Sequence, residues 1–384
     1  MTLKGRWTLL STATSLARSS HSVSVTKSGL LTVYGGELKP RTPIDTGSGK
    51  DDPPRGSLHV FDLNKDNLSQ NWTTLSPALP SSEDTTHGSS VPEPRVGATL
   101  VCHEDALYMW GGRGGQQMTP FDQHQIGIWK ATVDQGGQGA HGIRWERIAP
   151  LNEDRAPSPR SYHTSVVHGD KLYVHAGCPD TGRLSTLHAF DVKKRIWETL
   201  ASAPEPGRGG TCLVPAAIRG SGDLLLRYGG FSGHELPTVQ GSVDVYAIGE
   251  NKWSTVDPAP DPEHGYPGPR SVHGFSPYQS RAPHLSNAVA ILYHGERDAS
   301  TLGHAGAGTF WDDAWVLAKE PGESAISGWA WHKVDVGAGD VPAGRGWFPP
   351  ASWVDPEGNT RVVMFGGLLS SNTRSDELWE LRVD

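Results

Sequence analysis

An arginine recurs six times along this chain of 384 residues, each time ahead of a β-rich segment that ends in two glycines or a close variant. The interval between arginines is roughly 45–75 residues, and its lower end matches the period of about 50 residues of known repeat architectures. The arginines are Arg18, Arg95, Arg160, Arg208, Arg270 and Arg345. The segment ends behind them read VYGG (33–36), MWGG (109–112), VHAG (174–177), RYGG (227–230), LYHG (292–295) and MFGG (364–367). The pattern predicts an array of similar β-units, because each unit must bury its apolar face against its neighbours.

Each repeat divides into four short strands. The first follows the arginine, the second ends at the diglycine, the third alternates apolar residues, and the fourth carries a tryptophan such as Trp197. The expected third strands are LHVFDL (58–63), LHAFDV (187–192), VDVYAI (243–248), DAWVLA (313–318) and ELWELRV (377–383). Period-two alternation between Gly, Pro and Asp clusters is typical of half-buried strands. The arrangement resembles the kelch repeat and predicts an all-β fold, a six-bladed kelch β-propeller forming a single domain over residues 1–384. The expected blades are approximately 18–75, 95–148, 160–200, 208–256, 270–334 and 345–384.

The sixth repeat stops at Asp384, directly after its third strand, and no tryptophan strand follows it. A matching segment, Trp7-Thr-Leu-Leu, precedes the first arginine. We therefore predict that residues 5–10 pair with the last blade and close the ring, since closure removes exposed strand edges.

Composition narrows the classes of partner. The net charge is −8 and no basic cluster occurs, which argues against nucleic acid. Three widely spaced cysteines, Cys102, Cys178 and Cys212, are typical of reduced thiols in a cytoplasmic or nuclear protein. Residues 1–20 lack an apolar run long enough for a signal peptide, and no segment has the length of a membrane span. We expect a soluble intracellular protein.

Most repeated residues have a structural interpretation. We expect the arginines and tryptophans to pack and hydrogen-bond between blades, and the histidines of RSSH (18–21), RSYH (160–163) and RSVH (270–273) to be blade-core residues. Long insertions interrupt the repeats instead, and four of the five follow a diglycine. They are 37–57, 79–94, 113–125, 231–241 and 296–312. Since loops at equivalent places emerge on one face of a propeller, this loop face is the expected place for function.

The fifth repeat carries the most chemistry. Glu296 follows the diglycine position, and Asp298 and His304 lie in the same loop. Two carboxylates and an imidazole are suitable ligands for Fe(II) or Zn. A two-histidine, one-carboxylate set recruiting His294 or His234 is an alternative. The opposing interpretation is a solvated loop whose polar groups cap turns.

Several segments carry detail beyond the generic repeat. They are ARSSHSVSV (17–25), YGGELKPRTPID (34–45), LHVFDL (58–63), ALYMWGGRG (106–114), RGG (208–210), RGW (345–347) and MFGGLLSSNTRSDELWEL (364–381). In them the chain resembles the nitrile-specifier, epithiospecifier and thiocyanate-forming proteins of cruciferous plants, over nearly its whole length. The resemblance implies a kelch propeller that assists breakdown of a sulfated thiohydroximate with a mononuclear Fe(II).

The resemblance also implies site residues. The family's metal motif is Glu-x3-Asp-x3-His, and here Glu296 and His304 match while Ser300 stands at the aspartate position. Asp298 is a candidate replacement. Of the family's substrate-binding arginines, one is matched by Arg160 and one by Thr99, which cannot clamp a sulfate as a guanidinium does. Trp347 matches a tryptophan of the family pocket.

Two classes of function follow. In the first, a pocket on the loop face binds a small molecule, and Arg160, Glu296 and His304 carry out a lyase or rearrangement step on an organic, sulfur-containing metabolite. A divalent metal would assist as a Lewis acid, or Glu296 and His304 would act as an acid–base pair without any redox cofactor. In the second, the loop face is a non-catalytic scaffold for a protein partner, with adaptable loops at 37–57 and 79–94. A copper-radical oxidase is a third class, but its Cys–Tyr pair has no convincing counterpart here.

Overall fold

Antiparallel sheets make up most of the chain in the computed structural model, which describes residues 2–64, 72–78, 91–121, 127–135, 141–218, 222–236, 239–337 and 339–384. Four sheets have four strands each. The first contains β2 (Ser22–Val25), β3 (Leu30–Tyr34), β6 (Leu58–Asp62) and β7 (Thr73–Leu75), and the second contains β8 (Thr99–His103), β9 (Ala106–Trp110), β12 (Ile128–Gln135) and β13 (His141–Ile148). The third contains β14 (Thr164–His168), β15 (Lys171–His175), β16 (Leu187–Asp191) and β17 (Ile196–Leu200), and the fourth contains β18 (Cys212–Ile218), β19 (Gly222–Tyr228), β22 (Val243–Ala247) and β23 (Lys252–Val256). A fifth sheet has eight strands in the order β24 (Gly274–Pro277), β25 (Ala288–Tyr293), β28 (Ala314–Lys319), β29 (Trp329–Asp335), β1 (Leu3–Thr12), β34 (Glu377–Val383), β32 (Thr360–Phe365) and β31 (Ala351–Val354).

The remaining elements are short and lie in the connections. Two-stranded hairpins are β4 (Glu37–Lys39) with β5 (Thr42–Pro43), β10 (Arg113–Gly114) with β11 (Thr119–Pro120), β20 (Phe231–Ser232) with β21 (His234–Glu235), β26 (Glu296–Asp298) with β27 (Thr309–Phe310), and β30 (Arg345–Gly346) with β33 (Leu368–Leu369). Helical structure in the described ranges is limited to 3₁₀ turns at Thr14–Leu16, Glu153–Arg155, Val239–Gly241, Ile248–Glu250, Pro283–Leu285 and Gly303–Ala305. None of these described helical segments is long and apolar enough to cross a membrane.

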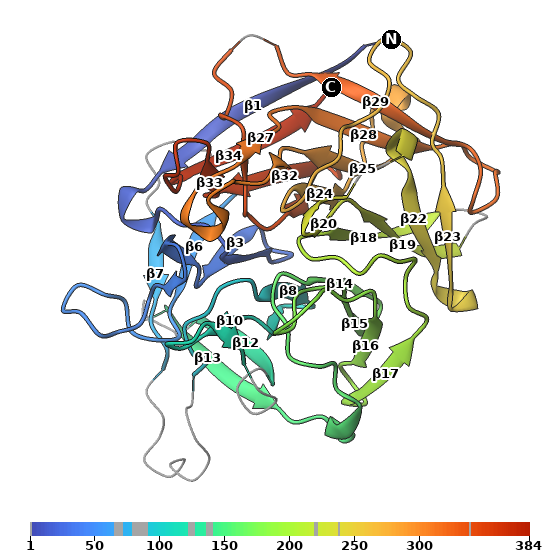
Figure 1. Ribbon diagram of the computed structural model, residues 1–384. Coiled ribbons are helices and arrows are strands. Elements are labelled where there is room, and N and C mark those ends of the chain that lie inside the picture. The colour runs from blue at the N-terminus through green and yellow to red at the C-terminus, as the bar shows by residue number, and fades with distance from the viewer. Residues whose placement is uncertain are drawn as a thin grey trace.

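The sheets are arranged around a common centre (Figure 1). Their innermost strands contact one another in the order β2, β8, β14, β18, β24 and β31, and β31 contacts β2 again. The apolar core lies between neighbouring sheets, where for example Trp110 of β9 packs edge-on against Trp197 of β17 with ring centroids 6.0 Å apart. The all-β propeller predicted from the sequence is therefore confirmed.

The repeated arginines and diglycines connect the repeats to one another. Each arginine donates from Nη1 to the carbonyl of the first diglycine position of its own repeat, as Arg95 does to Gly111 at 2.9 Å and Arg18 to Gly35 at 2.9 Å. The second glycine then donates its N–H to the carbonyl of the arginine in the next repeat, and Gly367 donates back to Arg18 at 2.9 Å. The first diglycine position has a positive φ, which explains why glycine is common there. The predicted structural role of the arginines agrees with these bonds.

A second set of bonds surrounds the centre of the propeller. We call its six members the central ring: Ser20, Gly97, Tyr162, Gly210, Val272 and Trp347. Each backbone N–H donates to the carbonyl of the member in the preceding repeat, and Ser20 donates to Trp347, with N···O distances from 2.7 to 3.0 Å. All six residues have a positive φ, between 47° and 62°. The central ring therefore holds the side chains of its non-glycine members close to the axis.

The N-terminal strand β1 joins the two halves of the eight-stranded sheet. It pairs antiparallel with β34 from Gly5–Val383 to Thr12–Glu377, and parallel with β29 at Leu3–Val334 and Lys4–Asp335. Residues 5–10, predicted to pair with the last strand, lie within this strand. Trp7 is buried and packs edge-on against His294 at 5.4 Å.

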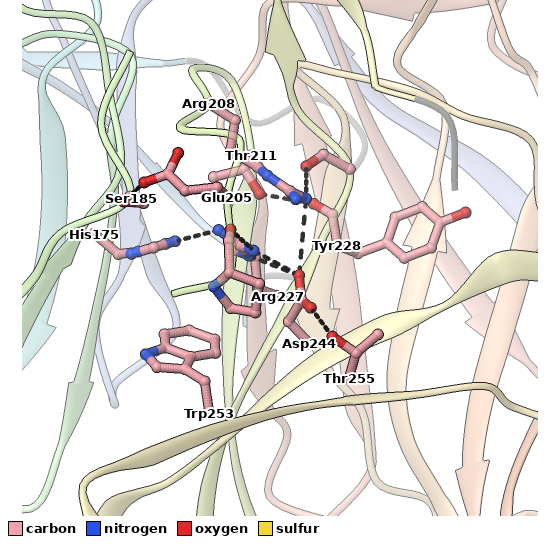
Figure 2. Close-up of polar contacts among 12 residues, drawn as sticks. His175, Ser185, Glu205, Arg208, Thr211, Arg227, Tyr228, Asp244, Trp253 and Thr255 are labelled. Atoms are coloured by element: carbon pink, nitrogen blue, oxygen red, sulfur yellow. Dashed lines mark hydrogen bonds and ion pairs between the residues drawn. The ribbon is translucent and has the colours of Figure 1, made fainter. Parts of the chain in front are cut away.

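Charged residues are also buried within the sheets (Figure 2). Arg227 of β19 donates from Nη2 and Nε to Asp244 of β22 at 2.7 and 2.9 Å, and Thr255 donates to the other oxygen of the same carboxylate at 2.7 Å. Arg208 lies 3.8 Å from the same carboxylate. Because burial of a charge is costly unless it is paired, this network is a structural feature of the blade and does not line the pocket described next.

Candidate functional site

A pocket with a volume of about 530 Å³ lies among the loops of the loop face. We call it the upper pocket. Its lining includes Glu296 of β26, Ser300 and His304 from the following loop, and Trp347 of the central ring. Four of the residues predicted for the site are thus brought to one place.

The upper pocket is rich in arginine. Arg41 comes from the β4–β5 turn, Arg113 from β10, Arg183 from the loop after β15, and Arg374 from the loop before β34. Arg374 lies 3.9 Å from Glu37. In the part of the chain that the structure describes, the guanidinium groups of Arg41, Arg113 and Arg183 have no carboxylate within 4 Å, although the Arg41 backbone N–H donates to Glu37 at 2.7 Å. Three cations from three different loops are therefore left without an ion-pair partner. The carboxylates of Glu37, Asp180 and Glu235 also line the pocket.

Arg113 and Arg183 are held by backbone and aromatic contacts. Arg113 donates from Nε to Ser161 at 2.6 Å, and its guanidinium carbon lies 5.9 Å from the centre of the Tyr162 ring. Arg183 lies 4.8 Å from the centre of the Phe231 ring, and its Nε is buried with no hydrogen-bond partner among the described residues. Arg183 also lines the upper pocket, where its positive charge favours an anion.

Glu296 is a buried acid at the side of the upper pocket, with 5% of its surface exposed. Burial raises its pKa to about 8, and the neighbouring Glu235 carboxylate adds to the shift. Hydrogen bonds from the Trp347 side chain and the Gly308 backbone oppose the shift only in part. Glu296 is therefore a neutral carboxylic acid near pH 7, able to donate a proton.

The pKa of His304 is shifted in the opposite direction. Partial burial lowers its pKa, and the positive charges of Arg41, Arg113 and Arg183 lower it further. The imidazole is therefore neutral near pH 7 and can accept a proton. Both side chains line the upper pocket, and burial and neighbouring charges shift their pKa values in opposite directions.

The predicted metal ligands do not converge. The Asp298 carboxylate is 65% exposed and accepts hydrogen bonds from Arg297 at 2.9 Å and Thr309 at 2.5 Å. Within the described ranges, the group of three His, Cys, Asp or Glu ligand atoms that lie within 4.8 Å of one another is His103, Glu104 and Asp170. Glu296, Asp298 and His304 are not such a group, and Ser300 adds only a neutral hydroxyl. The residues present do not fit the three-ligand iron site that the resemblance implies.

The alternative histidines do not complete a metal site. His294 is fully buried between blades, with its ring against Trp7 and its carbonyl accepting from Arg270 at 3.0 Å. The side chain of His234 lies outside the described part of the chain. The same is true of residues 79–90 and 122–126, which include much of two predicted loops.

Two predicted substrate-binding residues lie elsewhere. Arg160 is 1% exposed and donates to Ser158, Ala176 and Thr186. Its guanidinium therefore stabilises the blade and does not line the upper pocket. Thr99 bonds His163 at 2.9 Å and Ser165 at 2.7 Å, on the other side of the central ring. Both positions follow the repeat pattern, and repeat positions point between the blades. Neither residue lines the upper pocket, and their predicted contact with a substrate stays a prediction.

The arginines that do line the upper pocket were not singled out from the sequence. Arg113 directly follows the diglycine MWGG, and Arg183 lies six residues after Gly177. Both are therefore in loops that emerge on the loop face. The sequence signal for these residues is an arginine that follows the diglycine position and is not one of the six repeated arginines.

The raised pKa of Glu296 leads to a prediction for stability. A carboxyl group with an ordinary pKa near 4.5 when unfolded and about 8 when folded binds more protons in the folded state between those pH values. Stability should therefore fall as the pH rises through this window, by up to about 1.4 kcal/mol per pH unit. Glu296→Gln cannot ionise, so we expect urea unfolding to show it gaining stability relative to the natural chain between pH 5.5 and 8.5. The same difference in the free energy of unfolding between the two proteins at pH 5.5 and at pH 8.5 would contradict the raised pKa of Glu296.

Comparison with known proteins shows which family the chain belongs to. N-(sulfonatooxy)prop-2-enimidothioate sulfolyase of Thlaspi arvense is 25% identical over 392 aligned positions, covering 96% of this chain and 93% of that protein. Kelch-like protein 40 of Xenopus tropicalis is 28% identical over 177 positions, which cover 44% of this chain and a quarter of that protein. A solved structure titled "Structure of YjhT" superposes with a TM-score of 0.60 at 16% identity, over 96% of this chain and 98% of that one, and supports the fold alone. A family model described as the KLHDC2/KLHL20/DRC7 Kelch-repeats domain matches residues 47–283, more than half of the chain, and the chain belongs to that kelch-repeat family.

Proposed function

We propose that the upper pocket binds a small organic anion and promotes its breakdown or rearrangement, as a lyase-type enzyme without a redox cofactor. The observation that carries this proposal is the meeting of three guanidinium groups without carboxylate partners, Arg41, Arg113 and Arg183, with the neutral acid Glu296. Guanidinium groups bind sulfate, carboxylate and phosphate through paired hydrogen bonds. A free anion would replace the missing ion-pair partners.

The chemistry follows from the charges. In a molecule with an oxyanion leaving group, the bond to that oxygen breaks and its electron pair leaves with the oxyanion. The arginines stabilise the negative charge that develops there. Glu296 donates a proton to the leaving oxygen, which carries away the electron pair of the broken bond, and His304 accepts the proton that the organic body loses as its new multiple bond forms. Trp347 and Phe231 supply an apolar wall for the organic body.

The relative from Thlaspi arvense supports the choice of substrate class. Its name specifies a sulfonatooxy group on an imidothioate, which is an organic sulfate with sulfur in its body. We infer the same class for this chain, an organic sulfate or a similar oxyanion. Among the described residues, Glu235, Glu296 and His304 are not a group of three ligand atoms within 4.8 Å of one another, so the proposed steps use the acid–base pair of the protein.

We further infer that the eight-stranded sheet consists of two blades joined by β1, so that the propeller has six blades in a closed ring. Support comes from the six bonds of the central ring and from the bond from Gly367 to Arg18, both of which return to the first repeat. The closed order of contacts among the six innermost strands agrees with this inference.

Binding of a simple anion tests the pocket. We expect Arg183→Gln to weaken binding of ethyl sulfate by about ten- to a hundred-fold, because it removes a charge-assisted hydrogen-bond donor of about 1.5–3 kcal/mol. Isothermal titration calorimetry measures the affinity. The matched control is Arg195→Gln, an arginine that donates to the Ala149 carbonyl away from the pocket. Equal affinities for Arg183→Gln and the natural chain would contradict the proposal.

A second candidate is a protein-interaction surface. Two large apolar side chains on the loop face are exposed beside pocket-lining residues, Leu302 at 72% and Leu38 at 50%. An exposed apolar pair at the rim of a charged pocket suits a peptide with an acidic residue flanked by apolar ones. Loss of captured protein partners in Leu302→Ser, with ethyl sulfate affinity unchanged, would favour this function over catalysis.

A further inference from the structure

A second cavity lies on the opposite side of the central ring. We call it the lower cavity; its volume is about 320 Å³, and it is lined by the innermost strands, for example by Val25, Val166 and Phe275. Its lining is mainly aliphatic and aromatic, with hydroxyl groups from serine and threonine, the imidazoles of His21, His163 and His273, and the thiols of Cys102 and Cys212. It holds none of the arginines of the upper pocket.

Two side chains of the central ring line both cavities. They are Tyr162 and Trp347, and their rings meet edge to face with centroids 5.2 Å apart and planes at 88°. At two other ring positions, Gly97 and Gly210, no side chain exists. The separation between the cavities therefore depends on these two aromatic side chains.

We propose that Tyr162 and Trp347 are specificity-determining residues that restrict the upper pocket to compact anions by closing it off from the lower cavity. The proposal rests on anion binding in the upper pocket and goes further, because it limits the length of the organic body. An anion held by the arginines with a short body fits above the two rings. A long unbranched tail meets the aromatic pair and stays outside the apolar lower cavity.

The backbone conformation of the central ring allows the two aromatic side chains to be replaced by glycine without strain. Tyr162 and Trp347 have φ values of 51° and 60°, in the left-handed region that glycine adopts without strain. Gly97 and Gly210 hold the same ring position with φ values of 62° and 59°. Tyr162→Gly and Trp347→Gly should therefore keep the hydrogen bonds of the central ring while removing the ring side chains.

The experiment uses linear alkyl sulfates from ethyl to octyl, titrated into the full chain by calorimetry. The measured quantity is the ratio of octyl to ethyl sulfate affinity, which does not depend on how well the arginines bind the sulfate. In the natural chain we expect the affinity gain to stop after the first few methylenes. In Tyr162→Gly and Trp347→Gly each further methylene that enters the lower cavity should raise affinity by about four-fold. Urea unfolding confirms that each variant is folded.

Val272→Gly is the matched control, since it makes the same backbone change at a ring residue that lines only the lower cavity. Its octyl to ethyl ratio should stay at the natural value. The inference is overturned if the natural chain already gains affinity up to octyl sulfate, if both aromatic variants keep its ratio, or if Val272→Gly raises the ratio as much as they do. Absence of binding for every chain length in the natural protein would instead overturn the proposed function.

Discussion

Deletion of residues 1–12 should abolish cooperative folding. The deletion removes β1, which pairs with β34 along seven residue positions and with β29 at two. Two strand edges would be exposed in the middle of the eight-stranded sheet, and exposed edges pair with other chains. The buried Trp7 and Leu3 would also leave the apolar cluster they share with Tyr293 and Leu381. We expect aggregated protein with no cooperative transition in urea, as measured by tryptophan fluorescence and size-exclusion chromatography.

Smaller changes in β1 separate the contribution of its side chains to stability from that of its backbone hydrogen bonds. Trp7→Ala keeps the backbone bonds of β1 and should cost about 3–5 kcal/mol, the usual range for emptying a buried tryptophan site. Removal of residues 1 and 2 alone, which precede β1, should leave the unfolding midpoint unchanged. A monomeric protein with the natural midpoint after deletion of residues 1–12 would show that β1 is dispensable.

Replacement of Glu296 by glutamine should lower turnover of an organic sulfate by about a hundred- to ten-thousand-fold, the usual contribution of a general acid. The test substrate is N-(sulfonatooxy)prop-2-enimidothioate, the compound named for the Thlaspi relative, and the measurement is release of sulfate. In the natural chain the rate should fall as the pH rises through about 8, because the acid loses its proton there. Ethyl sulfate binding by Glu296→Gln should persist above pH 8, since no carboxylate forms to repel the anion.

Asp298→Asn provides the control for this experiment. Asp298 lies on the same strand β26, two residues away, but its carboxylate points to Arg297 and Thr309 and does not line the upper pocket. Turnover by Asp298→Asn should match the natural chain. An equal loss in both variants would contradict the acid role of Glu296 and favour a site that uses both carboxylates together.

The repeat made much of the fold predictable. The third strands expected at 58–63, 187–192, 243–248, 313–318 and 377–383 lie within about one residue of β6, β16, β22, β28 and β34. The physical reason is local: period-two alternation and flanking turn residues determine where a strand can form. The pairing of residues 5–10 with the last strand followed from counting strands, because one tryptophan segment was missing at the end and present at the start.

The site was predictable only in part. Glu296 and His304 were found because the fifth repeat is irregular, and irregular loops stand out against a repeated background. Arg113 and Arg183 were missed because each is ordinary in its own loop and becomes notable only beside the other. Arg160 was predicted to bind the substrate from the family resemblance, and in the structure its guanidinium donates to four acceptor atoms of three residues inside the blade.

The sequence by itself determined the all-β repeat, the loop face and the loop from Glu296 to His304, because these depend on residues close together in the chain. Only the tertiary structure decided which cations meet in the upper pocket, that Asp298 points away from it, and that Tyr162 and Trp347 separate two cavities. The first and third of these facts depend on distances between residues from different repeats, 185 positions apart for the two aromatic residues, and the direction of Asp298 depends on the pairing of its own hairpin with Thr309. Such distances are set by the packing of whole sheets around a common axis, and no local pattern encodes them.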